Sequence, residues 1–240
     1  MTKDLSPKIP EEVLLVAKTL IKRGHKAYLV GGCLRDLLIK KTPYDWDIAT
    51  DAIPDEVQKV FKDTIYENSF GTVGVKTDSE DQRLKVIEVT TFRKEGKYTD
   101  KRHPDDVKFA ETIQEDLARR DFTVNAIALS VDEKKSELID PFDGMADLDK
   151  KIIRAVGISE ERFEEDALRL LRAVRLATQL GLSQGWTIEG ETKKAIIKKS
   201  HLLEFIAKER IRDEIIKLIM SDDAHDGVRL LEEVGLLKYI

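Results

Sequence analysis

The sequence predicts an α+β protein in which a mixed-sheet domain over residues 1–157 precedes an all-helical domain over residues 158–240. Strand and helix patterns alternate through the first part, whereas only helical spacing continues after Gly157. The composition fits a globular chain, because 41% of the 240 residues are hydrophobic and 36% are charged. Disorder is therefore excluded.

In the first domain, Leu14, Ala17, Leu20 and Ile21 recur at helical spacing and predict a helix over residues 10–23 that Gly24 ends. Further segments are expected as strands over 27–30, 46–49, 72–76 and 85–92, and as a helix over 55–61 that Pro54 opens. Residues 93–104 lack periodicity and are rich in charge and turn formers, which predicts a mobile excursion.

In the second domain, acidic residues follow Ser159 and helical spacing continues to about Leu180, which predicts one continuous helix. Further helices are expected over 187–199, 205–220 and 228–234. The second domain is therefore expected to contain no strand.

The charge distribution is more informative than its total. The net charge of −5 alone disfavours a nucleic-acid partner, but residues 150–217 hold 15 basic and 11 acidic residues, a local charge of +4. The single cysteine, Cys33, excludes an internal disulfide, and it forms no zinc pattern with the four histidines. No apolar run spans a bilayer and no signal-peptide core precedes Pro10, so we expect a cytoplasmic protein without a membrane partner.

Two carboxylates flank a tryptophan at the start of an expected strand. Residues two apart in a strand point to the same face, so Asp45 and Asp47 are expected to project together while Trp46 packs the other way. Carboxylate oxygens are the ligands that Mg²⁺ prefers, and two such ions activate an attacking hydroxyl and stabilise a leaving pyrophosphate. In isolation, the same spacing fits a polar strand edge equally well.

Two neighbouring features strengthen the magnesium interpretation. Gly31 and Gly32 lie between a strand and a short helix, where backbone N–H groups approach phosphate oxygens, and Arg35 follows. Glu88 interrupts an apolar strand and is a candidate third metal ligand. Taken separately, the glycines fit a tight turn and Glu88 fits a solvated strand face.

Together these residues resemble the nucleotidyltransferase superfamily related to DNA polymerase β, which has a strand, a GG turn, D-x-D and a third carboxylate on a later strand. The segments RRDFTVNAIA at 119–128 and EDALR at 165–169 narrow the resemblance further. Over about residues 27–218 the chain resembles the head and neck domains of the bacterial class II CCA-adding tRNA nucleotidyltransferases, a family similar to bacterial poly(A) polymerases.

The resemblance implies a role for each matching residue. Metal binding and catalysis are assigned to Asp45, Asp47 and Glu88. The nucleotide is assigned to Gly31, Gly32, Arg35, Arg120, Asp121, Asn125, Asp166, Arg169, Arg172 and Arg175. A flexible loop that helps the pocket to switch from CTP to ATP is assigned to Arg93, Gly96, Tyr98, Asp100 and Arg102. The alternative for this loop is a disordered connector.

The base-reading assignment also has a physical basis. Cytosine and adenine offer an amino donor beside a ring-nitrogen acceptor, whereas uracil and guanine offer the reverse pattern. Asp166 accepts and Arg169 donates, so the pair suits C and A and opposes U and G. On one continuous helix, Asp166, Arg169, Arg172 and Arg175 are expected to form a polar stripe facing away from the core. An i to i+3 surface salt bridge is the alternative.

Basic residues of the second domain are candidates for contact with RNA phosphates, although lysine runs also form merely solvated helix faces. They are Lys193, Lys194, Lys198, Lys199, Lys208, Arg210 and Arg212. The segment from Glu209 to Glu214 also resembles a neck motif for which we expect a structural role. The family's glycine in the turn before D-x-D is Lys40 here.

The expected activity is template-independent addition of C, A or both from CTP and ATP to the 3′ end of tRNA, with release of pyrophosphate and with Mg²⁺ in a two-metal site. Poly(A) polymerase, a CC-adding or A-adding specialist, a small-molecule nucleotidyltransferase and an impaired RNA- or nucleotide-binding module are the alternatives. The resemblance covers the head and neck without the body and tail domains, so tight tRNA binding is not expected of these 240 residues. The oligomeric state is left open.

Overall fold

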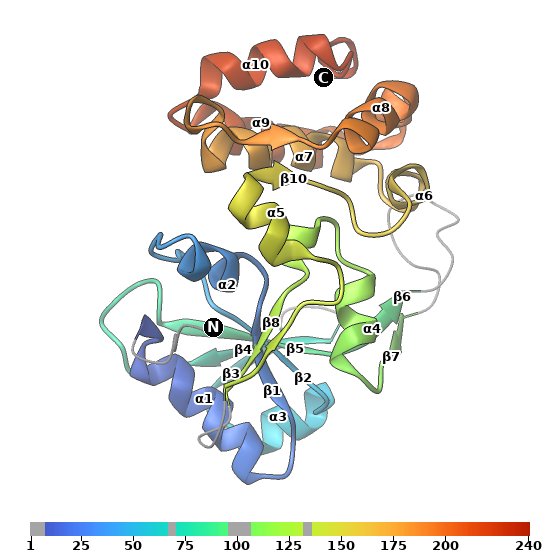
Figure 1. Ribbon diagram of the computed structural model, residues 1–240. Helices are drawn as coiled ribbons and strands as arrows, with labels where there is room; N and C mark the ends of the chain where they lie inside the picture. Colours follow the sequence, from blue (N-terminus) through green and yellow to red (C-terminus); the bar gives the residue numbers. More distant parts are fainter. Residues whose placement is uncertain (1–7, 67–70, 96–106, 132–135) are drawn as a thin grey trace. The chain divides into compact units, whose positions relative to one another are not determined.

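The computed structural model describes residues 8–66, 71–95, 107–131 and 136–240 (Figure 1). Contacts divide the chain into two compact units. The first consists of residues 1–94, 107–120 and 125–144. The second consists of residues 95–106, 121–124 and 145–240. The expected boundary lay at residue 157, whereas the contacts assign residues 145–157 to the second unit.

A seven-stranded mixed sheet occupies the first unit within the described residues, in the order β3-β4-β5-β2-β1-β8-β9. β2 and β5 run parallel, and the other neighbouring strands run antiparallel. The strands are β1 (Ala27–Val30), β2 (Asp47–Thr50), β3 (Thr64–Tyr66), β4 (Thr72–Lys76), β5 (Val86–Thr91), β8 (Ala128–Ser130) and β9 (Leu138–Ile139). The four expected strands are confirmed to within one residue at each end, and β3, β8 and β9 are additional short strands.

Four helices accompany the sheet among the described residues of this unit. They are α1 (Glu11–Lys22), α2 (Gly31–Leu38), α3 (Pro54–Val60) and α4 (Ile113–Ala118). α1 contacts β1 and α3, and α3 contacts β4 and β5, while α2 contacts β1, β2 and β8 (Figure 1). The expected helices near residues 10–23 and 55–61 are confirmed, and Gly24 ends the first with a positive φ of 93°. α2 begins at Gly31, the first residue of the double glycine.

The core of the first unit follows the side-chain alternation of its strands. In β5 every second residue is buried, and Ile87 and Val89 are fully buried. The expected excursion over 93–104 is wrong at its start, because Arg93–Glu95 (β6) pairs with Val107–Phe109 (β7) in a separate two-stranded sheet. Residues 96–104 of the excursion lie outside the described residues.

The second unit is mainly helical. Its α-helices are α5 (Gly144–Lys150), α6 (Ser159–Glu165), α7 (Leu168–Gly181), α8 (Gly190–Lys199), α9 (Lys208–Ile219) and α10 (Ala224–Glu233). Shorter 3-10 turns are η2 (Thr123–Asn125), η3 (Leu182–Gln184), η4 (Ser200–Phe205) and η5 (Leu237–Tyr239).

None of the helices in the described part of the chain is long and apolar enough to cross a membrane.

The expectation that the second domain contains no strand is wrong at one place. Ile152–Ile153 (β10) and Thr187–Ile188 (β11) pair in parallel, and the helix expected from residue 187 begins only at Gly190. The β-branched side chains of β11 favour the extended backbone. Glu189 then caps α8 by accepting hydrogen bonds from the backbone N–H groups of Glu191 and Thr192 at 3.0 and 2.7 Å.

Close packing of α7 against α10 makes Gly227 sensitive to substitution. A Cβ there would lie 2.6 Å from both Cγ2 and Oγ1 of the buried Thr178 and 3.1 Å from Leu218. We predict that Gly227→Ala lowers the free energy of unfolding by about 1–3 kcal/mol, because the overpacking exceeds the gain in helix propensity. Gly190→Ala is the matched control, since no atom lies within 4 Å of its added Cβ. Urea denaturation measures both variants, and equal stability of Gly227→Ala and the parent would contradict the packing.

Candidate functional site

The two strands at the centre of the first sheet bring two carboxylates together. Asp47 is the first residue of β2, and its Cα partner across the parallel ladder is Glu88 of β5. Opposed residues of neighbouring strands project to the same face, so the Asp47 and Glu88 carboxylates lie on one side of the sheet. Asp45 is exposed just before the strand, and Trp46 is only 3% exposed. Trp46 is thus buried while Asp45 is exposed, as expected for neighbouring residues whose side chains point to opposite faces.

This carboxylate group concentrates negative charge. Burial, together with the charges of Glu88 and Asp45, raises the pKa of Asp47 to about 7, while the charge of Arg120 opposes the rise. The ionised form of Asp47 is therefore disfavoured until a cation compensates it.

Gly31 brings the backbone against this group. Its φ is +72°, and an added Cβ would lie 3.1 Å from Asp47 Oδ2 and 3.2 Å from Arg120 Nη1. A larger residue is thus excluded both by conformation and by space. The double glycine, the D-x-D segment and Arg120, which are far apart in sequence, meet at one place in the first unit.

Arg35 lies beside the second glycine. Its Nη2 is 3.6 Å from the position that a Cβ on Gly32 would take. Arg35 Nη1 donates to Asn125 Oδ1 at 2.8 Å, and Arg35 Nε donates to Asp36 Oδ1 at 2.9 Å. Arg120 Nη1 donates to the backbone oxygen of Asn125 at 3.4 Å. Asn125 therefore links the two arginines that the resemblance assigns to the nucleotide.

Asp116 is a site residue that the sequence reasoning missed. It is 1% exposed, and it accepts hydrogen bonds from Arg119 Nη2 at 2.7 Å and from Arg120 Nη2 at 3.0 Å. Although burial alone would raise the pKa of Asp116, the guanidinium groups of Arg120 and Arg119 hold it below its usual value. The acid stands three and four residues before the two arginines on a helix, and this spacing was the available signal.

The donor set of the carboxylate group suits magnesium. Asp45, Asp47 and Glu88 supply only oxygen ligands, and their mutual repulsion is relieved by a divalent cation. Among the described residues, no three acidic, histidine or cysteine side chains converge closely enough to form a metal site by themselves. Mg²⁺ is usually bound by one or two carboxylates together with water and substrate phosphates.

In the second unit, the expected continuous helix from Ser159 to Leu180 is wrong. The helix is interrupted at Asp166, whose φ of −138° and ψ of 104° are extended, and a new helix begins at Leu168. Asp166 Oδ1 accepts a hydrogen bond from the backbone N–H of Leu168 at 3.0 Å, which satisfies a donor at the start of α7. Asp166 therefore lies in the break between α6 and α7.

The expected solvent-facing polar stripe is also wrong. Arg169 is only 8% exposed, and its Nη1 donates to Glu165 Oε2 at 2.5 Å and to the backbone oxygen of Arg162 at 3.1 Å. Asp166 Oδ2 accepts a hydrogen bond from Arg210 Nη2 of α9 at 2.9 Å. Buried charges require partners, so each member of the proposed base-reading pair has a partner of opposite charge.

Arg172 and Arg175 belong to a second ionic network in the same unit. Arg172 Nε donates to Asp121 Oδ2 at 2.9 Å, and Arg175 Nε donates to Glu214 Oε2 at 2.6 Å. The charge of Asp121 raises the pKa of Arg172, whereas burial lowers that of Arg175 against the attraction of Glu214. Asp121 thus holds Arg172.

The structural role expected for the segment from Glu209 to Glu214 agrees with its contacts. Arg210 and Glu214 are one turn apart on α9, and they pair with Asp166 and Arg175, respectively. Neither was named in the sequence as a partner of the base-reading segment. Their i, i+4 spacing on a helix with opposite charges was the available signal.

Four of the five expected RNA-contacting lysines are engaged in ion pairs, and the fifth, Lys208, donates from Nζ to the backbone oxygen of Tyr239 at 3.2 Å. Lys198 and Lys199 pair with Glu160, Lys193 pairs with Glu233, and Lys194 pairs with Glu191. These contacts favour the solvated helix face over a phosphate-binding surface. Of the expected flexible-loop residues, Arg93 is in β6, and its backbone N–H donates to Asp116 Oδ1 at 3.3 Å. Gly96, Tyr98, Asp100 and Arg102 lie outside the described residues.

Family models match two segments of the chain. Residues 27–154 match the poly A polymerase head domain. Residues 185–240 match the domain described as "Probable RNA and SrmB- binding site of polymerase A".

Curated relatives and solved structures agree with these matches. The CCA-adding enzyme of Lactobacillus gasseri is 45% identical over 96% of this chain and 55% of its own length. The structure of the Bacillus stearothermophilus CCA-adding enzyme in complex with CTP has a TM-score of 0.84 and 40% identity, covering 100% of this chain and 54% of that one. A CCA-adding enzyme in complex with ATP has a TM-score of 0.78 and 25% identity, covering 97% and 53%.

The chain spans about half the length of the curated relatives that it matches. The family match covers more than half of the chain itself and includes the double glycine, the D-x-D carboxylates, Glu88 and Arg120. The chain therefore belongs to the family defined by the poly A polymerase head domain, in which its similar relatives are CCA-adding enzymes.

Proposed function

We propose that this chain carries the catalytic and base-selecting parts of a tRNA nucleotidyltransferase that adds C and A from CTP and ATP to the tRNA 3′ end. The single observation that carries the proposal is the meeting of Asp47, Glu88, Gly31 and Arg120 in the first unit. The names of the similar relatives, and the complexes of two solved neighbours with CTP and with ATP, support the choice of substrates. A cytoplasmic location belongs to the same proposal, because its substrates are tRNA and nucleoside triphosphates.

In the proposed reaction, the terminal 3′ oxygen of the RNA attacks the α-phosphate, forming a new phosphodiester bond. The bond between the α-phosphate and the bridging oxygen breaks, and pyrophosphate leaves. Arg35, Arg120 and the N–H groups after the glycine turn hold the triphosphate and compensate its charge. Asp45, Asp47 and Glu88 would hold two Mg²⁺ ions. The chemistry that Mg²⁺ would supply here is a lowered pKa of the attacking hydroxyl and charge stabilisation of the leaving pyrophosphate.

Base selection is assigned to Asp166 and Arg169. Asp166 accepts from the amino group of cytosine or adenine, and Arg169 donates to the adjacent ring nitrogen. Arg210 and Glu165 fix the orientation of the two side chains, because each holds one of them by an ion pair. A fixed pair discriminates well, since a wrong base leaves a charged group without its hydrogen bond.

A second candidate function is poly(A) addition, which the name of the matching family model favours. The two candidate activities differ in the RNA 3′ end at which nucleotide addition ceases. Purified protein is offered tRNAs that end before CCA, after CC and after CCA, each with one labelled nucleoside triphosphate. CCA addition predicts C on the first, A on the second and nothing on the third, whereas long A tails on any RNA would favour the polymerase.

We predict that Asp45→Asn and Asp47→Asn each reduce nucleotide incorporation about a thousandfold or more. The physical reason is the loss of charge stabilisation worth several kcal/mol at the reacting phosphate. Asp63→Asn, at an exposed carboxylate of the same unit, is the matched control with unchanged incorporation. Parent-like rates in both D-x-D variants would exclude the catalytic site and leave a binding module.

We predict that Arg169→Gln lowers kcat/KM for CTP and ATP about 10- to 100-fold and narrows the preference over UTP and GTP, because one charged hydrogen bond to the base is lost. Arg229→Gln removes an exposed arginine of α10, to which no contact with nucleotide or RNA is assigned, and serves as the control. The measurement is single-nucleotide incorporation with each of the four triphosphates. Use of UTP or GTP as readily as CTP by the parent would disprove base reading.

We predict that Asp47→Asn stabilises the metal-free protein, by on the order of 2 kcal/mol at pH 8 and by less at pH 5. The pKa of Asp47 is about 7 in the folded state and lies above its usual value, so stability of the parent is lost as pH rises from about 4 to about 7. The amide side chain of the Asp47→Asn variant does not ionise, so the stability of the variant does not fall over this pH range. Thermal unfolding in a chelator measures the difference, and added Mg²⁺ should stabilise the parent but not the variant. A pH-independent difference between the two proteins would contradict the assigned pKa.

A further inference from the structure

Arg120 stands near two carboxylates of the first unit, one with which it pairs and one that it only approaches. Its Nε and Nη2 donate to Asp116 Oδ2 at 3.3 and 3.0 Å. Its Nη1 lies 3.2 Å from the position that a Cβ on Gly31 would take, and Asp47 Oδ2 lies 3.1 Å from the same position. Arg120 and Asp47 therefore approach one point, yet in the described part of the chain the ion pair of Arg120 is with Asp116.

Asp116 is surrounded by donors that hold it in place. It is 1% exposed, and its Oδ1 accepts hydrogen bonds from Arg119 Nε at 3.0 Å, from Arg119 Nη2 at 2.7 Å and from the backbone N–H of Arg93 at 3.3 Å. Its Oδ2 is left to Arg120. Two donors of one planar guanidinium group on the same oxygen fix the direction in which the remaining nitrogen, Nη1, points.

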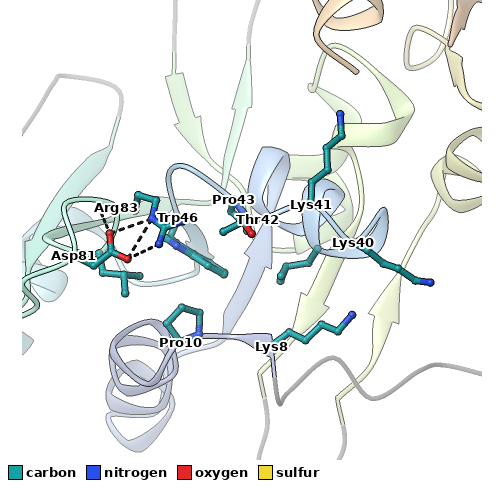
Figure 2. Close-up of a pocket in the computed structure, with 11 residues that line it drawn as sticks. Lys8, Pro10, Lys40, Lys41, Thr42, Pro43, Trp46, Asp81 and Arg83 are labelled. Carbon is teal, nitrogen blue, oxygen red and sulfur yellow. Dashed lines mark hydrogen bonds and ion pairs between the residues drawn. The ribbon is translucent and has the colours of Figure 1, made fainter. Parts of the chain in front are cut away.

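The backbone that carries Asp47 is also fixed. The preceding Trp46 is 3% exposed and lines a pocket together with Pro10 and Pro43 (Figure 2). The backbone N–H of Asp47 donates to Sγ of the buried Cys33 at 3.5 Å. Because the start of β2 is held in this way, the separation between Asp47 and Arg120 depends on where the long side chain of Arg120 is held.

A direct ion pair between Arg120 and Asp47 would compete with a metal ion. Arginine pairs strongly with carboxylates, and a positive charge within about 4–6 Å stabilises an ionised carboxylate by a factor of about 10 to 1,000. A divalent cation would have to displace that partner before it could bind. The same pair would also consume the Arg120 donor that the proposed reaction requires for the triphosphate.

We propose that Asp116 is a positioning residue that keeps Arg120 away from Asp47, so that Asp47 stays available to a divalent cation and Arg120 to a phosphate. Asp116 acts through Arg120 and is not assigned a contact with substrate or metal. The inference rests on the proposed assignment of Asp47 as a metal ligand, and it is tested by cation binding without RNA or nucleoside triphosphate.

The probe is Mn²⁺, which takes the same oxygen ligands as Mg²⁺ and whose free concentration is measured by electron paramagnetic resonance. We expect Asp116→Asn to weaken the Kd for Mn²⁺ about tenfold or more, because the released Arg120 pairs with Asp47. We expect Arg120→Gln to bind Mn²⁺ at least as tightly as the parent, since a positive charge near the carboxylates is removed.

The decisive protein is the double variant in which Asp116→Asn is combined with Arg120→Gln. If Asp116 acts through Arg120, the double variant recovers a Kd for Mn²⁺ within about twofold of that of Arg120→Gln alone, so the two effects are not additive. A merely structural role of Asp116 predicts instead that the weakened Mn²⁺ binding of Asp116→Asn persists in the double variant.

Asp147→Asn is the matched control. Asp147 is a buried carboxylate of the second unit that accepts a hydrogen bond from Arg154 Nε at 2.8 Å. Its replacement breaks a comparable ion pair, and it should lower the melting temperature as Asp116→Asn does. It should leave the Kd for Mn²⁺ unchanged, which separates loss of stability from loss of the cation site.

A second measurement requires only the folded parent, with Arg120→Gln to identify the signal of Arg120 in ¹⁵N spectra. The Arg120 Nε–H should exchange slowly with solvent both in chelator and in Mg²⁺, because Asp116 binds it in both. Rapid exchange in chelator would overturn the inference. An equal Kd for Mn²⁺ in Asp116→Asn and the parent would also overturn it, as would a parent that binds no Mn²⁺. A parent that binds Mn²⁺ but incorporates no nucleotide would refute the proposed activity and leave the role of Asp116 intact.

Discussion

The direct juxtaposition of Asp47 and Glu88 across two parallel strands is the constraint on which the proposed catalytic site depends. Two carboxylates on adjacent strands of one face repel each other, and partial burial strengthens the repulsion. The surroundings are arranged around this charge. Gly31 allows the backbone to approach it, Arg120 partly compensates it, and buried Asp116 holds Arg120 in place. The first unit thus carries an electrostatic strain that a metal ion and a triphosphate are suited to relieve, at some cost to its own stability without them.

In the second unit the charges that lie close together are positive, because several arginines of α7 are neighbours. Each of three arginines of α7 donates to a different acidic residue, namely Glu165, Asp121 or Glu214. In a fourth pair, Arg210 of α9 donates to Asp166, which lies just before α7. Such pairs add little to stability at an exposed surface, but in a partly buried network each one fixes a side-chain orientation. The network therefore serves to position charges, while the apolar residues Phe163, Leu170 and Val174 provide the packing.

The sequence was informative where a function constrains short segments and uninformative where distant segments meet. The strands over 27–30 and 72–76 and the grouping of the D-x-D and GG segments were predictable, since alternation and turn chemistry are local. The break at Asp166 was not, because the apolar spacing of α6 and α7 continues across it and conceals the extended backbone. The pairing of Asp166 with Arg210 depends on the packing of α9, which a helical pattern alone does not specify. The short β10 and β11 pair was missed for the same reason.

The ion pair between Asp166 and Arg210 also bears on the order in which the protein becomes competent. The two residues are 44 positions apart, so the orientation of Asp166 is established only after α9 has been synthesised and has packed against α7. The sheet with its carboxylates is built almost entirely from the preceding part of the chain. During synthesis, an incomplete chain would therefore contain the residues proposed to hold the triphosphate before the pair proposed to select the base is in place. The long sequence separation between Asp166 and Arg210 delays the proposed base selection until folding of the helical unit is nearly finished.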